Sequence, residues 1–347
     1  MQLNATGVAV MAALGAALGM ASMQAAASNV TISGVIDVNV ERLSTPKESV
    51  TRVSTGGLSN SRLEFGAVED LGDGNQAFFL HQMQFAADTG TGPTPRETYV
   101  GLRGNWGQLA LGRQNTPSYW IVGYADPSWS GDYSRVSNNV YFYAPWRESN
   151  AVSYNTPVYN GFKGRFMVTT GQETADHNGR VISTGVEYRS GPLYLGFVSD
   201  HKDIKNIGSP KIEGSRDNYF AATYRLDTVE PTFIYHTYNG YYAYPPYVGF
   251  QTKGWDVQLG ARWKIGGPHG AYISAVHRHD NVGKDLTDND SVLIGYNYRF
   301  SKRTDVYINH GRVFTKGSPN VPYPLTFNYN GSANPERGTQ VGLRHAF

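Results

Sequence analysis

The stretch Trp255–Ile265, WDVQLGARWKI, alternates apolar and polar residues along its whole length. Its odd positions carry Trp, Val, Leu, Ala, Trp and Ile, while its even positions include Asp256, Gln258, Arg262 and Lys264. Successive side chains of a β-strand point to opposite faces of the sheet, so a period of two predicts a strand with one apolar and one polar face. Such a strand needs an apolar environment on one side and a polar one on the other.

Other parts of the chain repeat this alternation. Ile36, Val38 and Val40 alternate with polar residues, and so do Leu63 and Phe65. The pattern predicts sixteen strands, at residues 30–43, 59–70, 75–88, 96–104, 107–114, 149–156, 162–171, 181–190, 192–201, 216–226, 229–239, 252–265, 270–280, 290–300, 304–315 and 337–347. Short turns alternate with longer Gly-, Pro- and Asn-rich connections, which is typical of outer-membrane barrels with short turns at one rim.

Two fold classes share this strand pattern, a soluble β-sandwich and a membrane-spanning β-barrel. A sandwich buries its apolar faces in one core and has no wet interior, whereas these polar faces carry Arg, Lys, Asp, Glu and Asn on strand after strand. Strands that face lipid must close into a barrel, because an open sheet edge leaves backbone groups unpaired in hydrocarbon. We therefore predict an all-β fold, a sixteen-stranded antiparallel transmembrane β-barrel.

Composition narrows the classes of function. The chain has 347 residues, of which 17% are charged, and its net charge is +2. So small a charge gives no argument for a nucleic-acid partner. The sequence contains no cysteine, which excludes disulfides and thiolate chemistry and suits a chain that crosses an oxidising compartment.

Residues 1–27 differ in kind from the rest. An apolar stretch from Gly7 to Met20 is followed by Ala25-Ala26-Ala27, which is typical of a secretory signal peptide with small residues at its cleavage site. No Lys or Arg precedes the apolar run, and an N-terminal membrane anchor is the alternative, although the run is short for a spanning helix. We expect a signal peptide at 1–27 and one barrel domain at 28–347.

Residues 114–149 form a long connection without strand or helical periodicity. It is crowded with aromatic residues, namely Tyr119, Trp120, Tyr124, Trp129, Tyr133, Tyr141, Phe142, Tyr143 and Trp146. A loop of this length is usually functional or disordered, and disordered segments are poor in aromatics. We therefore expect it to fold into the barrel and narrow the bore. Its aromatics either pack on the wall or form a stacking surface for sugars and ring-bearing solutes.

Five stretches carry a family resemblance: VTISGVIDVNV at 30–40, SRLEFGAVEDLGDGNQAFF at 61–79, RETYVGLRGNWGQLALGRQ at 96–114, NAVSYNTPVYNGF at 150–162 and VGLRHAF at 341–347. They resemble the general diffusion porins of Gram-negative outer membranes, of the beta-proteobacterial type. The resemblance covers essentially the whole chain after the signal segment. It implies a sixteen-stranded barrel, a homotrimer, and a third long loop that folds inward as a constriction. Residues 125–129 replace the Pro-Glu-Phe-Gly-Gly tip of enterobacterial members, so the shape of the constriction should differ.

This resemblance implies an outer-membrane channel for passive diffusion of small hydrophilic solutes and ions. The implied partners are outer-membrane lipid, lipopolysaccharide and further copies of the chain, with no nucleic acid, no cofactor and no metal. A porin selective for sugars or aromatic rings is an alternative. An outer-membrane barrel enzyme or an adhesin is a further one, but no nucleophile or acid pair at catalytic spacing stands out in the sequence.

Three arginines carry over from the family's constriction by motif position: Arg62 in SRLEF, Arg96 in RETYV and Arg147 in WRESN. The alternation supports Arg62, which lies on the face opposite Leu63 and Phe65. If Arg96 points inward, Glu97 and Tyr99 should point outward, which is tolerable only where subunits meet. The alternative is that these arginines merely form ion pairs on a solvated wall.

Two loop carboxylates, Asp126 and Asp132, are expected to face the arginines across the bore. The loop offers few acids besides Glu148, against Arg135 and Arg147. A constriction selects by charge and width, so this balance predicts a channel that favours anions.

Two further patterns are weaker candidates for metal sites. Asp70 and Asp73 lie around two glycines, but the full calcium-loop pattern is absent, so a tight turn is the better interpretation. His277 and His279 share one strand face, and without a third ligand the pair is a weak metal signal.

Overall fold

The computed structural model of the chain describes residues 29–141, 146–171, 178–205, 212–241, 251–282, 288–315, 325–326 and 334–347. The expected signal peptide, residues 1–27, lies outside the described residues. So do Phe142 and Tyr143 of the aromatic loop.

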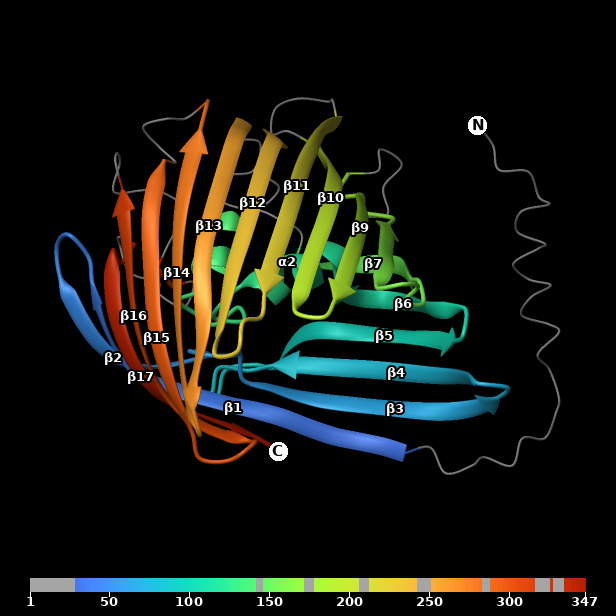
Figure 1. Ribbon diagram of the computed structural model, residues 1–347, viewed down its shortest axis with the longest axis horizontal. Helices are drawn as coiled ribbons and strands as arrows, with labels where there is room; N and C mark the ends of the chain where they lie inside the picture. The colour runs from blue at the N-terminus through green and yellow to red at the C-terminus, as the bar shows by residue number, and fades with distance from the viewer. Residues whose placement is uncertain are drawn as a thin grey trace.

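The described chain forms one closed antiparallel barrel. Its strands are β1 (Asn29–Ser44), β2 (Ser49–Thr55), β3 (Arg62–Gly72), β4 (Asn75–Gln84), β5 (Thr94–Gly104), β6 (Gly107–Asn115), β7 (Arg147–Asn155), β8 (Phe162–Thr169), β9 (Val181–Ser190), β10 (Leu193–Lys205), β11 (Ile212–Tyr224), β12 (Val229–Tyr241), β13 (Gln251–Gly266), β14 (His269–Asp280), β15 (Asn289–Arg299), β16 (Thr304–Thr315) and β17 (Arg337–Ala346). Every pairing between neighbours is antiparallel. The first strand pairs with the last, and this pairing closes the barrel (Figure 1).

The seventeen strand segments occupy sixteen strand positions, because β2 and β3 share one edge of β1. Val38–Ser44 of β1 pairs with β2, and Asn29–Val35 pairs with β3. Residues 56–61 interrupt this position. The sixteen-stranded barrel is therefore confirmed, and each predicted strand corresponds to an observed one. The prediction missed β2 and began the next strand inside the interruption.

The interruption turns into the barrel because local groups hold it there. Asp37 Oδ2 accepts hydrogen bonds from the backbone N–H groups of Leu58 (2.8 Å) and Ser59 (2.9 Å). A Cβ at Gly57 would lie 1.9 Å from the hydroxyl oxygen of Tyr307. A side chain here would have to displace the Tyr307 ring of β16, so glycine suits this turn into the barrel.

The predicted alternation has the expected direction. On β13, Asp256 and Gln258 point inward and are fully buried, whereas Leu259 points outward and is 60% exposed. The outer surface carries a belt of exposed apolar side chains that suits hydrocarbon, and it includes Val30, Ile32, Val100, Leu111, Val186, Phe197, Leu259, Ile294, Ile308, Val341 and Leu343.

Loop L3, which we define by its described residues, 116–141 and 146, lies inside the barrel. It contains α2 (Pro117–Ala125) and the π-helical turn η1 (Val136–Val140). The sequence shows no helical period here because aromatic residues occupy both packed and exposed positions of α2: Tyr119 and Tyr124 pack against the core, whereas Trp120 is exposed. Thr116 caps the helix by accepting a hydrogen bond from Tyr119 N (3.2 Å). Among the described helices, none combines the length and the apolar character needed to cross a membrane.

The main apolar core lies between L3 and the inner wall. The helix α2 contacts β8 to β12, and η1 contacts β13 and β14. Figure 1 shows α2 behind β10 to β12, within the barrel. The shared core consists of Ile121, Val122, Ala125, Val136, Val140, Tyr141, Tyr194, Val198, Tyr219, Ala221, Ile234 and Val276. L3 covers this part of the inner wall, so water in the bore contacts mainly the rest of the wall.

Candidate functional site

The three predicted arginines gather on the wall formed by β3, β5 and β7, and Tyr119 of L3 lies within electrostatic reach of Arg96 and Arg147. Arg62 lies on β3, Arg96 on β5 and Arg147 at the start of β7. Arg96 is within electrostatic reach of both other guanidinium groups, and its Nη1 donates to Gln84 Oε1 (2.8 Å). The structure therefore brings the three together on one side of the bore, and their role in conduction stays a prediction.

A β-bulge explains how Arg96 points inward. The pairing of β4 with β5 shifts register between His81 and Met83, so the strand opposite carries one extra residue. Arg96 and Glu97 are consequently both buried inside, and Tyr99 lines an interior cavity with Glu97. The expectation that Glu97 and Tyr99 would point outward is wrong, because it assumed strict alternation.

The acids nearest to these arginines come from the barrel wall. Arg62 Nε donates to Glu64 Oε1, two residues along the same inward face. Glu97 accepts hydrogen bonds from Asn115, at its backbone N (3.2 Å) and its Nδ2 (2.8 Å). Residues two apart on a strand share a face, so the sequence alone could have predicted the ion pair of Arg62 with Glu64.

Asp126 does not face the lumen. Its side chain is fully buried within L3. It accepts hydrogen bonds from Ser128 N (2.9 Å), Ser128 Oγ (2.8 Å), Ser130 N (2.8 Å) and Ser134 Oγ (2.6 Å). The predicted placement of Asp126 opposite the arginines is therefore wrong. An Asp followed by Pro and Ser is a turn signal, and that signal pointed to this local role.

Asp132 lies near a different set of charges, namely Glu41, Arg52 and Arg135. Its Oδ1 accepts a hydrogen bond from Thr326 Oγ1 (2.9 Å). Burial of the carboxyl group and the nearby Glu41 raise the pKa of Asp132 to about 8. At neutral pH this group is mostly protonated, so it is a poor source of negative charge for the bore. The predicted opposition of Asp132 to the arginine cluster is not observed.

The connection between β16 and β17 contacts L3 through two of its described residues, Leu325 and Thr326. Its Leu325 is fully buried against L3. The carbonyl oxygen of Leu325 accepts hydrogen bonds from Arg135 Nη2 (2.6 Å) and Asn138 Nδ2 (2.8 Å). On the other side Tyr133 donates to Glu41 Oε2 of β1 (2.6 Å). We call Glu41, Tyr133, Arg135 and Leu325 the L3 clamp.

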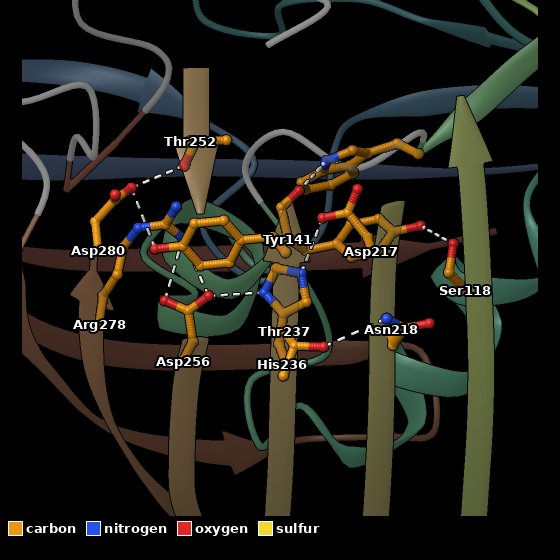
Figure 2. Close-up of polar contacts among 12 residues, drawn as sticks. Ser118, Tyr141, Asp217, Asn218, His236, Thr237, Thr252, Asp256, Arg278 and Asp280 are labelled. Atoms are coloured by element: carbon orange, nitrogen blue, oxygen red, sulfur yellow. Dashed lines mark hydrogen bonds and ion pairs between the residues drawn. The ribbon is translucent and has the colours of Figure 1, made fainter. Parts of the chain in front are cut away.

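A polar network lies on the wall where β11 to β14 face L3 (Figure 2). His236 lies between Asp217 (Nε2 to Oδ1, 2.9 Å) and Asp256 (Nδ1 to Oδ2, 2.7 Å). Arg278 Nη1 pairs with the same Asp256 at 3.0 Å, and the ring of Tyr219 stacks on His236. These charges satisfy one another beneath L3, so they are not available to solutes in the bore.

At three further places on the inner wall one carboxylate lies between two arginines. We call these the two-arginine groups. The groups are Glu187 with Arg165 (3.3 Å) and Arg189 (3.9 Å), Glu230 with Arg225 (3.3 Å) and Arg262 (2.5 Å), and Asp305 with Arg299 (3.4 Å) and Arg344 (2.6 Å). The acids are the buried partners: the Glu187 and Asp305 side chains are 4% exposed, against 48% for Arg189 and 60% for Arg299. Each group therefore shows net positive charge to the bore.

Two cavities lie between L3 and the wall at the end with the short turns. One, of about 240 Å³, is lined by Trp120, Arg165 and Lys163 among others. The other, of about 560 Å³, is lined by residues that include Trp129 and Arg299. Both combine an aromatic side chain of L3 with cationic side chains of the barrel.

The side chains of the two weaker metal candidates make local contacts with neighbouring residues. Asp70 Oδ1 accepts a hydrogen bond from Gly72 N (2.9 Å), and the turn there is tight, as predicted. His277 pairs with Asp290 and His279 with Asp288. Within the described ranges, no three His, Asp or Glu side chains gather in a way that could hold a metal ion.

Comparison with known proteins gives a consistent result. A family model described as Gram-negative porin matches residues 8–318. Outer membrane porin protein 32 of Delftia acidovorans is 27% identical, over 98% of this chain and 98% of its own. Major outer membrane protein P.IB of Neisseria meningitidis is 25% identical, over 85% of this chain and 91% of its own.

Solved structures share the fold. The anion-selective porin from Comamonas acidovorans superimposes with a TM-score of 0.79 at 24% identity, covering 92% of this chain and 100% of that one. The trimer form of OmpT, an outer membrane protein of Vibrio cholerae, gives a TM-score of 0.65 at 16% identity, with 92% and 100% covered.

Proposed function

The chain belongs to the Gram-negative porin family, and from that premise we propose that its pore favours anions. As a porin it is an outer-membrane protein of a Gram-negative bacterium and forms a channel for passive diffusion of small hydrophilic solutes. Passive diffusion needs no catalytic group, because the concentration gradient supplies the free energy.

The observation that carries the proposal is the charge of the two-arginine groups. Each holds two cations against one acid, and the exposed members are arginines. The cluster of Arg62, Arg96 and Arg147 adds positive charge on the wall formed by β3, β5 and β7. Screening in physiological salt acts over about 8 Å, so charges on the wall of a narrow bore still act on an ion that passes through it. The name of the anion-selective relative from Comamonas agrees with this reasoning.

The reversal potential of the purified protein in a planar bilayer tests this proposal. Under a KCl gradient we expect the sign that corresponds to chloride passing more readily than potassium. Stable single-channel steps are expected in the same recording, and they separate a porin from a barrel enzyme or an adhesin. A reversal potential at zero, or of the opposite sign, would contradict the anion preference.

We also propose that the protein assembles as a homotrimer. Arg113 of β6 lies opposite Thr98 of β5, at a position whose side chain points outward. Its guanidinium group donates a hydrogen bond to Ser149 Oγ (2.9 Å). A guanidinium group on the outer face is costly in hydrocarbon, so this polar patch is better suited to contact with another subunit. The trimer form of OmpT supports the same assembly.

Sedimentation in detergent tests the assembly. We expect a trimer for the wild type and a shift toward monomer for Arg113→Glu, because the substitution reverses the charge of this patch and removes the hydrogen bond to Ser149. Lys253→Glu is the matched control, since Lys253 is exposed on β13, far around the barrel. A wild-type monomer, or an Arg113→Glu variant that remains fully trimeric, would argue against this contact.

A further inference from the structure

Three aromatic side chains of L3 each lie against an arginine of the barrel wall. The pairs are Trp120 with Arg165 (6.0 Å from the guanidinium carbon to the ring centroid), Tyr124 with Arg189 (4.0 Å) and Trp129 with Arg262 (4.8 Å). We call Trp120, Tyr124 and Trp129 the aromatic track. All three arginines belong to the two-arginine groups described above, so the track runs along the positively charged part of the wall.

The two tryptophans of the track are exposed although L3 lies inside the barrel. Trp120 is 47% and Trp129 57% exposed, whereas Ile121 and Val122 of the same helix are buried in the core. Packing on the wall is one of the two roles expected for the loop aromatics. It does not explain why about half of each tryptophan stays exposed. A large apolar ring left exposed inside a bore is typical of a surface that binds a solute.

Backbone strain accompanies the exposure of Trp129. Its φ is 52° and that of Ser130 is 62°, in the left-handed region that non-glycine side chains rarely adopt. The hydrogen bond from Ser130 N to Asp126 Oδ2 (2.8 Å) holds this conformation. Strained residues that the surrounding structure holds in place are concentrated at functional sites.

Each exposed indole opens into a cavity that also contains cations. The cavity of about 560 Å³ at Trp129 includes Arg299 and Arg344, and their side chains are 60% and 31% exposed. The cavity of about 240 Å³ at Trp120 includes Lys163. The larger volume falls in the usual range of small-ligand sites, about 300–1,000 Å³. A solute with both a flat ring and a negative charge would find a partner for each.

We propose that the aromatic track binds aromatic carboxylates as they pass through the pore. The ring stacks on an exposed indole, Trp129 above all, and the carboxylate accepts hydrogen bonds from a neighbouring guanidinium such as Arg299. An aliphatic anion gains the charge interaction alone, and a neutral sugar gains the stacking alone, so the aromatic anion is the solute class that uses both. This inference rests on the proposed anion-favouring pore and names its preferred solutes.

The test compares benzoate with cyclohexanecarboxylate, which has the same charge and a similar size but no π face. Each is titrated into a chloride-conducting bilayer, and the concentration that halves the chloride current is measured. In the wild type we expect benzoate to act at a lower concentration. One aromatic stacking contact is worth about a two- to tenfold change in that concentration. In Trp120→Leu/Trp129→Leu the two solutes should become equivalent, and in Trp120→Phe/Trp129→Phe the preference for benzoate should remain.

The chloride-to-potassium selectivity of the same variants separates this inference from the proposed function. Neither pair of substitutions changes a charge, so the reversal potential in KCl should stay at the wild-type value. Equal effects of the two solutes on the wild type would overturn the inference even if the pore favours anions, and this comparison needs no variant to fold. A benzoate preference that survives in the leucine variant would overturn it as well. A cation-favouring wild type would instead remove the proposed function.

Discussion

Replacing Arg62, Arg96 and Arg147 together by glutamine is expected to weaken the preference for anions sharply, while the two-arginine groups keep a remainder of it. Three positive charges then leave the wall formed by β3, β5 and β7, while Glu64 and Glu97 remain there. We expect the chloride-to-potassium permeability ratio to fall by about tenfold, which corresponds to ~1.4 kcal/mol of electrostatic free energy at the constriction. The reversal potential in a KCl gradient measures this ratio.

A matched control removes three charges from the outer face instead. Arg42, Arg216 and Lys253 are exposed on the outward parity of β1, β11 and β13, and their replacement by glutamine changes the net charge equally. The control should keep the wild-type ratio. If both triple variants shift the ratio alike, overall charge rather than the cluster sets the selectivity.

Asp126→Ala is expected to release the tip of L3 and to give a larger and noisier single-channel conductance. The carboxylate accepts four hydrogen bonds, from Ser128 N, Ser128 Oγ, Ser130 N and Ser134 Oγ. Hydrogen bonds to a charged acceptor are each worth about 1.5–3 kcal/mol, so the loss should exceed ~3 kcal/mol. The strained backbone at Trp129 and Ser130 would then relax, and L3 would no longer hold one position in the bore.

Asp126→Asn gives a graded comparison for this effect. Asparagine has the shape of aspartate but replaces one acceptor oxygen by a donor, so it can keep the hydrogen bonds to one side only. We expect a conductance and a noise level between those of the wild type and the alanine variant. An alanine variant with the conductance and noise of the wild type would show that the tip is held by packing, not by Asp126.

The barrel could be predicted because its physical rules act locally along each strand. A period of two reports which face meets lipid, and Leu259 and Asp256 obey it. The interruption at 56–61 could not be predicted, because it depends on Tyr307 of β16 fitting over Gly57. The local sequence indicates that the glycines interrupt the strand, but it does not identify Tyr307, 250 residues further along the chain, as the contact of Gly57.

The candidate site was predictable on the wall and less so in the loop. Arg62 followed from strand parity, whereas the bulge beside Arg96 broke that parity. In the loop, composition alone predicts acids that are free to face the bore. Asp126 instead satisfies the backbone of its own turn, and Asp132 is mostly neutral at its raised pKa of about 8. The contact of Arg135 with Leu325 joins two loops far apart in sequence, and no local pattern signals it.

The L3 clamp has a consequence for the order of assembly. Glu41 comes from the first strand, Tyr133 and Arg135 from the middle of the chain, and Leu325 from the connection that precedes the last strand. The two contacts together bridge the seam of the cylinder, where β1 pairs with β17. A nascent molecule with its final strand still unpaired would lack one of these two fastenings, so we expect the passage to acquire its working diameter only when the cylinder closes.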